Sequence, residues 1–269
     1  MLDANIIADR AVLGLPINTP YGEFKPMSIE EYMRRVQSVA ILSYGKKKLL
    51  AELGKAYKAE NPQASDEEIH SMLKNLYELP FLQLMSEYFT EYLIHYIILL
   101  RFCLFYDLNP DNDQDKEDEC LLKVRDFIID LSNEDFDEIR KILMTLNNQT
   151  EKIAFLNPKI QRGQDKKEKY FSGGSEDAPN LSTMITTCVT YSGIDFSVVA
   201  KWNAFQLQHA FQRIAQIISY ETSRLFATVA TDVEIENWTK NISLEHEEKN
   251  TDKEFNEFKK QLSGLCNSK

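Results

Sequence analysis

The segment Tyr92–Tyr106, YLIHYIILLRFCLFY, is the most apolar stretch of this 269-residue chain, and its interpretation decides the fold class. A membrane-spanning helix needs about 20 consecutive apolar residues. This segment is shorter, and it contains His95 and Arg101. We therefore expect a helix buried in the core of a folded domain, and no contact with a membrane.

The rest of the composition also favours helices. The chain has only 9 glycines and 8 prolines, and the many turns of a β-sandwich or barrel would need more. Ser28-Ile-Glu-Glu31 and Ser65-Asp-Glu-Glu68 have the spacing of capping boxes, which mark helix starts. From Pro80 an apolar pattern predicts one helix through to Tyr106, and a long helical stripe begins at Asn203. Pro-Tyr-Gly within residues 15–28 predicts a β-hairpin or extended arm.

These patterns predict an all-α fold, a multi-helix bundle in two subdomains with a short N-terminal β-hairpin or extended arm. The boundary is expected at 157–180, NPKIQRGQDKKEKYFSGGSEDAPN, where no apolar periodicity remains. We interpret 1–156 as an N-terminal helical subdomain, 157–180 as a linker, 181–242 as a C-terminal helical subdomain and 243–269 as a charged tail.

Charge and cysteine content narrow the function classes. With 31 basic and 42 acidic residues the formal net charge is −11, so the overall field repels a phosphate backbone and nucleic-acid binding is disfavoured. The four cysteines are widely spaced and form no CxxC, which gives neither a disulfide framework nor zinc spacing and suits a reducing cytoplasm. The start MLDANIIADR has no pattern of a secretory signal.

The acidic stretch Asp107–Cys120, DLNPDNDQDKEDEC, invites a calcium-loop interpretation. An EF-hand loop needs a glycine at position 6 and a bidentate Glu at position 12. A loop starting at Asp111 has Lys116 and Leu122 there, and one starting at Asn109 has Gln114 and Cys120. We therefore predict a solvated loop between helices, whose acids lie at the start of the next helix.

Other candidate sites are equally incomplete. Glu87, Glu91 and His95 recur every four residues, whereas di-iron bundles need Glu-x-x-His on two helices. His209 has no nucleophile or acid motif beside it, and the chain has no GxGxxG, GxxxxGK[ST], GxSxG or HExxH. We predict no catalytic, cofactor-binding or metal-ligating residue, no cofactor, and no enzymatic activity. The aromatic residues Trp202, Phe205 and Phe211 fit either an interaction surface or a buried helix face.

One ordered set of segments resembles a known family. EDFDEIRKIL at 134–143 is followed by NPKI at 157–160, by ITTCVTYSGIDFSVVAKWNAFQLQHAFQRIAQIISYE at 185–221 and by VEIENWTKNI at 233–242. This order resembles proteins encoded among the tail genes of tailed phages of Gram-positive hosts. The opening LPINTPYGEFKPMSIEEYMRRVQ at 15–37 is similar to theirs as well.

The resemblance implies a non-enzymatic role in phage tail morphogenesis. The expected role is a tail assembly chaperone that binds the tape-measure protein and helps to recruit tail tube subunits in the cytoplasm of the infected bacterium. The alternative is a structural virion component, such as a neck, connector or baseplate protein, located in the virion tail. A homo-oligomer is compatible with both.

Overall fold

Two short strands near the N-terminus, β1 (Ile17–Thr19) and β2 (Gly22–Phe24), pair antiparallel in the computed structural model of the protein. Ile17 lies opposite Phe24, and both side chains are buried. The structure describes residues 9–106, 114–172, 180–230, 235 and 237–240, except the side chains of 114–118 and 167–172. Within these residues the remaining named elements are all helices, so the predicted fold class, mostly helical with an N-terminal hairpin, is confirmed.

Both predicted capping boxes begin helices. The hydroxyl of Ser28 accepts a hydrogen bond from the amide of Glu31, and that of Ser65 from the amide of Glu68; each Glu side chain bonds back to the serine amide. These bonds satisfy amides that the first turn of a helix leaves without partners. The helices of this part of the chain are α2 (Ile29–Arg34), α3 (Val36–Leu42), α4 (Lys46–Glu60) and α5 (Asp66–Tyr77).

The helix predicted from Pro80 to Tyr106 is two helices, and that prediction was wrong. Helix α6 (Phe81–Tyr88) ends at Phe89, whose φ of −137° and ψ of 41° are not helical, and α7 (Thr90–Cys103) begins after it. Phe89 is buried and its ring lies edge-on to Tyr92, 5.8 Å between centroids. The break therefore turns an aromatic side chain into the core, a tertiary effect that helical periodicity does not report.

Helix α7 is the core helix that the apolar segment predicted. Tyr96, Leu99, Leu100 and Cys103 are each 1% exposed or less. No helix in the described part of the chain is long and apolar enough to cross a membrane. Around α7 the larger apolar cluster gathers side chains from the hairpin, from α3 to α6, and from α8 (Gln114–Ile129) and α9 (Asn133–Leu146).

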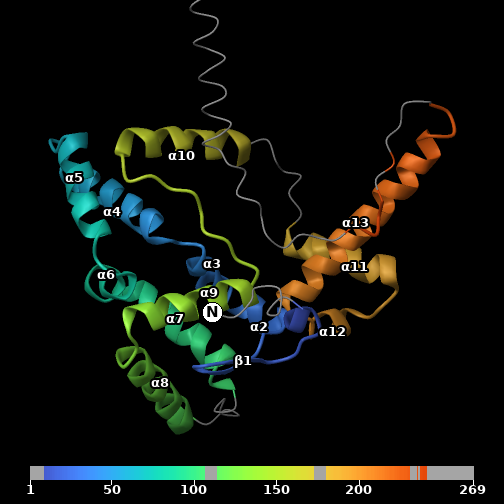
Figure 1. Ribbon diagram of the computed structural model, residues 1–269, viewed down its shortest axis with the longest axis horizontal. Helices are drawn as coiled ribbons and strands as arrows, with labels where there is room; N and C mark the ends of the chain where they lie inside the picture. Colours follow the sequence, from blue (N-terminus) through green and yellow to red (C-terminus); the bar gives the residue numbers. More distant parts are fainter. Residues whose placement is uncertain (1–8, 107–113, 173–179, 231–234, 236, 241–269) are drawn as a thin grey trace, which may run out of the picture. The chain divides into compact units, whose positions relative to one another are not determined.

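The segment 157–180, interpreted as a linker without apolar periodicity, contains a helix. Helix α10 (Pro158–Ser172) packs against α4 and α5, as Figure 1 shows. Pro158 is its first residue, where a missing amide hydrogen costs nothing. Gln161 is 3% exposed, and its amide oxygen accepts a hydrogen bond from the amide of Phe155 at 2.7 Å.

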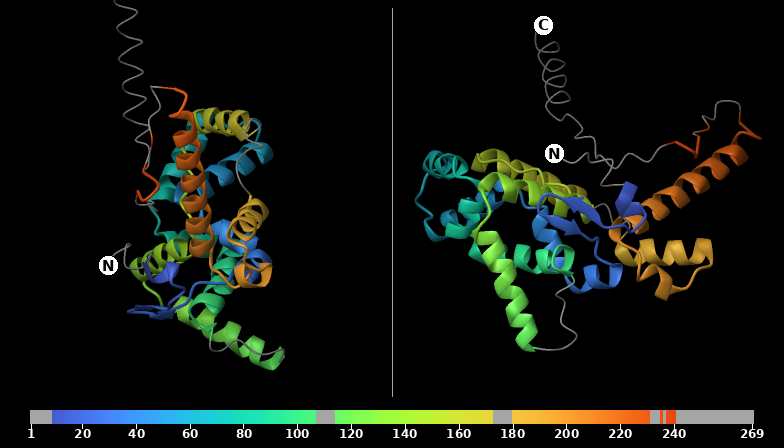
Figure 2. Two further views of the ribbon diagram at one scale, coloured as in Figure 1. Left: turned by 90° about the vertical axis from the view of Figure 1, so that its right-hand side faces the viewer. Right: turned by 60° about the horizontal axis from the view of Figure 1, so that its bottom comes forward.

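The C-terminal helices form a second apolar cluster. Helix α11 (Leu181–Ser192) ends at Gly193, whose φ of 68° gives the predicted left-handed cap, and α12 (Phe196–Val199) follows. Helix α13 (Ala204–Phe226) packs along α11, and Figure 2 shows its last turns extending beyond α11 in both views. The fully buried members of this cluster are Ile29, Cys188, Val199, Leu207 and Ile214.

The start of α13 is joined to the start of α2. Ser28 and Asn203 form an antiparallel β-bridge, and each caps its own helix. The amide of Ile29 donates to the carbonyl of Trp202 at 2.6 Å, and Asn203 Nδ2 donates to the carbonyl of Ala11. Residues up to Trp238 belong to one compact unit that holds both apolar clusters. The boundaries proposed for the two subdomains stay a prediction, and the charged tail 243–269 lies outside the described residues.

Candidate functional site

The acidic stretch 107–120 is described only in its second part. Its residues 107–113 lie outside the described residues, and α8 begins at Gln114. A twelve-residue calcium loop starting at Asp111 would have to include nine helical residues, 114–122. An EF-hand loop is not helical there, because its ligands alternate along a turn that a glycine makes possible.

The candidate metal and acid–base residues do not converge. Their four-residue spacing would place these three residues on one face of a continuous helix, but Glu87 is on α6 and Glu91 with His95 on α7, so they do not share one face. His95 Nδ1 lies 3.0 Å from Ser38 Oγ, while both glutamates are exposed. Among the described residues no group of three His, Cys, Asp or Glu side chains is placed to hold a metal ion.

His209 has a packing role. Its ring stacks on Phe205 with 6.0 Å between centroids, and partial burial, followed by the nearby charge of Arg213, lowers its pKa below the usual value. Phe205 is buried, and Trp202 and Phe211 pack against the second cluster. Of the two interpretations of these three aromatic residues, the buried helix face holds.

The exposed apolar side chains of the C-terminal helices are different ones, which the sequence patterns did not single out. We define the α12 patch as Tyr191, Phe196 and Val198, which are 48%, 55% and 46% exposed. They lie around the turn from α11 to α12, where Gly193 reverses the chain and Asp195 caps α12. Single exposed apolar residues are ordinary, but three within the eight residues 191–198 favour an interaction surface.

A second such group lies at the end of α13. We define the end patch as Leu225, Phe226 and Val229, which are 71%, 59% and 83% exposed. The amides of Val229 and Ala230 both donate to the carbonyl of Phe226, at 3.0 and 2.9 Å, so the backbone of this last turn is held. Spacings of three and four residues place the three side chains on neighbouring positions of the turn.

A pocket of about 180 Å³ lies between α4, α5 and the segment that enters α10. Gly54 lets α4 and α5 approach closely, since a Cβ atom there would lie 2.8 Å from Leu73 Cδ1. The polar side chains around this pocket are Lys55, Lys58, Asp66, Gln161 and Arg162. Its apolar lining comes from Ala51, Gly54, Ile69, Leu73, Phe155 and Leu156.

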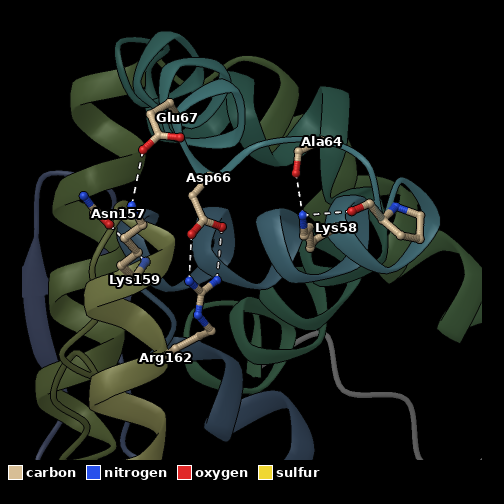
Figure 3. Close-up of polar contacts among 8 residues, drawn as sticks. Lys58, Ala64, Asp66, Glu67, Asn157, Lys159 and Arg162 are labelled. Atoms are coloured by element: carbon tan, nitrogen blue, oxygen red, sulfur yellow. Dashed lines mark hydrogen bonds and ion pairs between the residues drawn. The ribbon is translucent and has the colours of Figure 1, made fainter.

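Two ion pairs join α5 and α10, as Figure 3 shows, and Asp66 and Arg162 of one pair line the pocket. Arg162 donates from both terminal nitrogens to the carboxylate of Asp66, at 3.1 and 2.7 Å, and Lys159 Nζ lies 3.3 Å from Glu67. Lys58 donates to the backbone carbonyls of Pro62 and Ala64. These contacts explain why a segment without apolar periodicity is held as a helix against α5.

The ion pairs also fix the charge states around the pocket. The hydrogen bond from Arg162 lowers the pKa of Asp66 below its usual value. Partial burial alone would lower the pKa of Lys55, but its bonds to Asp165 and Glu52 raise it. The pocket is therefore an apolar recess with ion-paired groups on its rim, suited to holding an apolar group.

Comparisons with known proteins find similarity both in the C-terminal helices and over most of the chain. A family model described as "YomV second domain" matches residues 166–243, which begin inside α10 and contain α11, α12 and α13. No solved structure matches the chain. Over 246 residues, 91% of this chain and 92% of the other, the protein is 24% identical to the SPbeta prophage-derived uncharacterized protein YomV of Bacillus subtilis (strain 168).

Proposed function

We propose that the protein is a non-enzymatic interaction factor of phage tail morphogenesis, a tail assembly chaperone that binds the tape-measure protein through its C-terminal helices. The observation that carries this proposal is the α12 patch, three exposed apolar side chains around one turn. The patch lies inside the region that the family model matches, 166–243.

The phage context is supported by the comparisons, and the tail role by resemblance. Similarity over 91% of the chain to a prophage-derived protein supports a phage origin. The ordered segments at 134–143, 157–160, 185–221 and 233–242 resemble proteins of phage tail gene clusters. A chaperone of this kind would act in the cytoplasm of the infected host, with the tail tube protein as a second partner.

The chemistry of the patch fits a helical partner. A tyrosine and a phenylalanine offer about 150–250 Å² of buriable surface each, with few rotatable bonds to fix. Such a surface fits the apolar stripe of an amphipathic helix, read at spacings of three, four and seven residues. Tape-measure proteins expose long helical segments of this kind, as the family resemblance implies.

The polar groups near the pocket support a role without catalysis. Arg162 and Asp66 are engaged with each other, and Lys55 with Asp165 and Glu52. A catalytic site would need a nucleophile or base held toward a substrate position. Here the charged groups serve to hold α10.

Co-purification tests the proposal. The full chain with an affinity tag is produced in infected cells, and the tape-measure protein is identified by mass spectrometry in the eluate. Phe196→Asp should reduce its recovery at least about tenfold, because a carboxylate in the apolar contact must be desolvated. Ile94→Asp is the matched control, since Ile94 is 53% exposed on α7 and should not affect recovery. Equal recovery with Phe196→Asp would refute the assigned surface.

The alternative, a structural virion component, is favoured by the end patch, because exposed apolar groups at two places on one chain suit repeated assembly. Mass spectrometry of purified virions separates the two. A chaperone is absent from mature particles, whereas a fixed number of copies per particle would refute the chaperone role and support a neck, connector or baseplate protein.

A further inference from the structure

Helix α10 is held against α4 and α5 by charge. Three ion pairs between described residues cross from α10 to these helices: Arg162 with Asp66, Lys159 with Glu67, and Asp165 with Lys55. Figure 3 shows the first two, both with α5. In every pair at least one side chain is 41% exposed or more, so water and dissolved salt reach all three contacts.

Apolar contact contributes little to the docking of α10. The described side chains of this helix are those of 158–166, and the apolar ones among them are Pro158 and Ile160. Ile160 is 52% exposed, and a Cβ atom added at Gly163 would meet nothing within 4 Å. A surface helix is normally held by burying an apolar stripe. In this part of α10 a pocket of about 180 Å³ lies where such a stripe would pack.

The buried side chain of Gln161 does not tie α10 to the neighbouring helices either. Its Oε1 accepts a hydrogen bond from the amide of Phe155 at 2.7 Å, and its Nε2 donates to Asp165 Oδ1 at 2.8 Å. Both bonds stay within the segment 155–165. The cross-helix contacts that hold α10 in place are therefore mainly the three ion pairs.

We propose that α10 is a strap, held closed by its ion pairs over the pocket lining of α4 and α5, which opens as a unit when salt screens those pairs. The first apolar cluster stays folded during this opening. Opening uncovers Ile69 and Leu73, which line the pocket and are each 1% exposed in the closed state. Ionic strength thus controls whether this apolar surface is accessible. The inference goes beyond the proposed function, which concerns the α12 patch.

The range of charge interactions explains the salt dependence. The Debye length falls from about 10 Å at 0.1 M salt to about 3 Å at 1 M. An exposed ion pair shifts an equilibrium by up to about fivefold, so three pairs acting together can decide whether the strap is closed. Once released, α10 is a single helix of 15 residues, a length that is marginal in water, so its backbone amides exchange with solvent.

Hydrogen–deuterium exchange of the purified full chain, followed by mass spectrometry, tests the proposal. Peptides from α10 should exchange about threefold faster or more at about 1 M sodium chloride than at about 0.05 M. Peptides from the core helix α7 should exchange slowly at both concentrations, because they open only when the domain unfolds. Fluorescence of a dye that binds apolar surface should rise with salt as Ile69 and Leu73 are uncovered.

A double variant separates the ion pairs from other effects of salt. Lys159→Gln with Arg162→Gln removes two of the three pairs, so α10 should exchange about threefold faster or more at low salt and respond less to added salt. Arg34→Gln with Lys123→Gln is the matched control. It removes the same charge and two ion pairs, each within a single helix, and should leave α10 unchanged. Circular dichroism and thermal unfolding establish that both variants are folded.

Three results would overturn the proposal. The first is exchange of α10 at the slow rate of α7, which would mean that α10 opens only by global unfolding. The second is equal exchange of α10 at low and high salt. The third is a double variant that behaves like its control. These measurements need no phage partner, so the tape-measure proposal keeps its own separate test.

Discussion

Arg140 is the side chain whose removal the structure predicts most sharply. The residue is 7% exposed, and its guanidinium carbon lies 4.9 Å from the centroid of the Phe81 ring. Nε donates to the hydroxyl of Tyr96 at 3.1 Å, and Nη2 donates to the carbonyl of Leu42, the last residue of α3, at 2.9 Å. Nη1 pairs with Glu151, whose side chain is 53% exposed.

The loss of stability expected from Arg140→Met comes from the two buried groups that lose their hydrogen-bond donor. Methionine keeps the apolar contact with Phe81, and the exposed Glu151 returns to water. The Tyr96 hydroxyl and the Leu42 carbonyl stay in the core without this donor, at about 1–3 kcal/mol each. We expect the free energy of unfolding to fall by roughly 2–6 kcal/mol, a large part of the stability of an ordinary domain.

A double-mutant cycle with Tyr96→Phe tests the mechanism itself. Alone, Tyr96→Phe removes a hydrogen bond to a charged group and should cost about 1.5–3 kcal/mol. In the Arg140→Met background it removes a stranded hydroxyl and should cost nothing or restore stability. Urea unfolding followed by circular dichroism gives the four free energies. If the two changes add within about 0.5 kcal/mol, the hydroxyl is not coupled to the guanidinium and the reasoning fails.

Four further substitutions test local features of the fold. Gly163→Ala, at an exposed position inside α10 where a Cβ meets nothing within 4 Å, should raise the free energy of unfolding by about 0.5–1 kcal/mol. At Gly193 an added Cβ also meets nothing within 4 Å, but φ is +68°, so Gly193→Ala should lower the free energy of unfolding by about 1–2 kcal/mol. If both alanine variants changed the free energy of unfolding in the same direction, as measured in urea, the backbone argument would be contradicted. The pKa of Asp66 is lowered in the folded state, so its ionised carboxylate stabilises the fold above about pH 4, and this stabilisation is lost as the pH falls through the lowered pKa. Between about pH 5 and about pH 2 the Asp66→Asn variant should therefore lose less stability than the unmodified chain. A Cys266→Ser variant should show no rapid reaction with a thiol reagent until it is unfolded. Its three remaining thiols, Cys103, Cys120 and Cys188, are all buried, and burial raises the pKa of Cys103 to about 12.

Features fixed by nearest neighbours could be predicted from the sequence. The capping boxes at Ser28 and Ser65 need only a side chain three residues away, and the left-handed cap at Gly193 needs only a missing Cβ. The buried helix α7 follows from composition alone. Each of these depends on interactions within one or two turns.

Features fixed by partners distant in sequence could not be predicted from the sequence. Helix α10 lacks an apolar stripe because its cations Lys159 and Arg162 pair with the acids Glu67 and Asp66 of α5, more than ninety positions earlier in the chain. The helix break at Phe89 depends on where the core lies. A signal for α10 was available in Pro158, which suits a first helical position, but the absence of apolar periodicity outweighed it.

The exposed apolar groups of the C-terminal helices were missed for a related reason. Helical periodicity shows which side chains share a face, and it cannot show how much neighbouring structure covers that face. Phe205 and Phe226 lie on the same helix, yet one is 2% exposed and the other 59%, because α11 ends before the last turns of α13. Exposure along α13 is a property of packing, and it separates the part of the helix that builds the core from the part that is free to bind.

The size of the second cluster explains why such free surface exists. The cluster has five buried apolar residues, one of which, Ile29, is contributed by α2, and eight partly buried apolar residues pack against them. A core that small cannot cover the apolar residues that α11, α12 and α13 carry, since helices are stable when their apolar faces are buried against another layer. The first cluster gathers residues from seven helices and the hairpin, and its helices also leave single apolar residues exposed, among them Ile94 and Ile129. The exposed apolar residues of the C-terminal helices are the physical basis for the contact that we propose at the α12 patch.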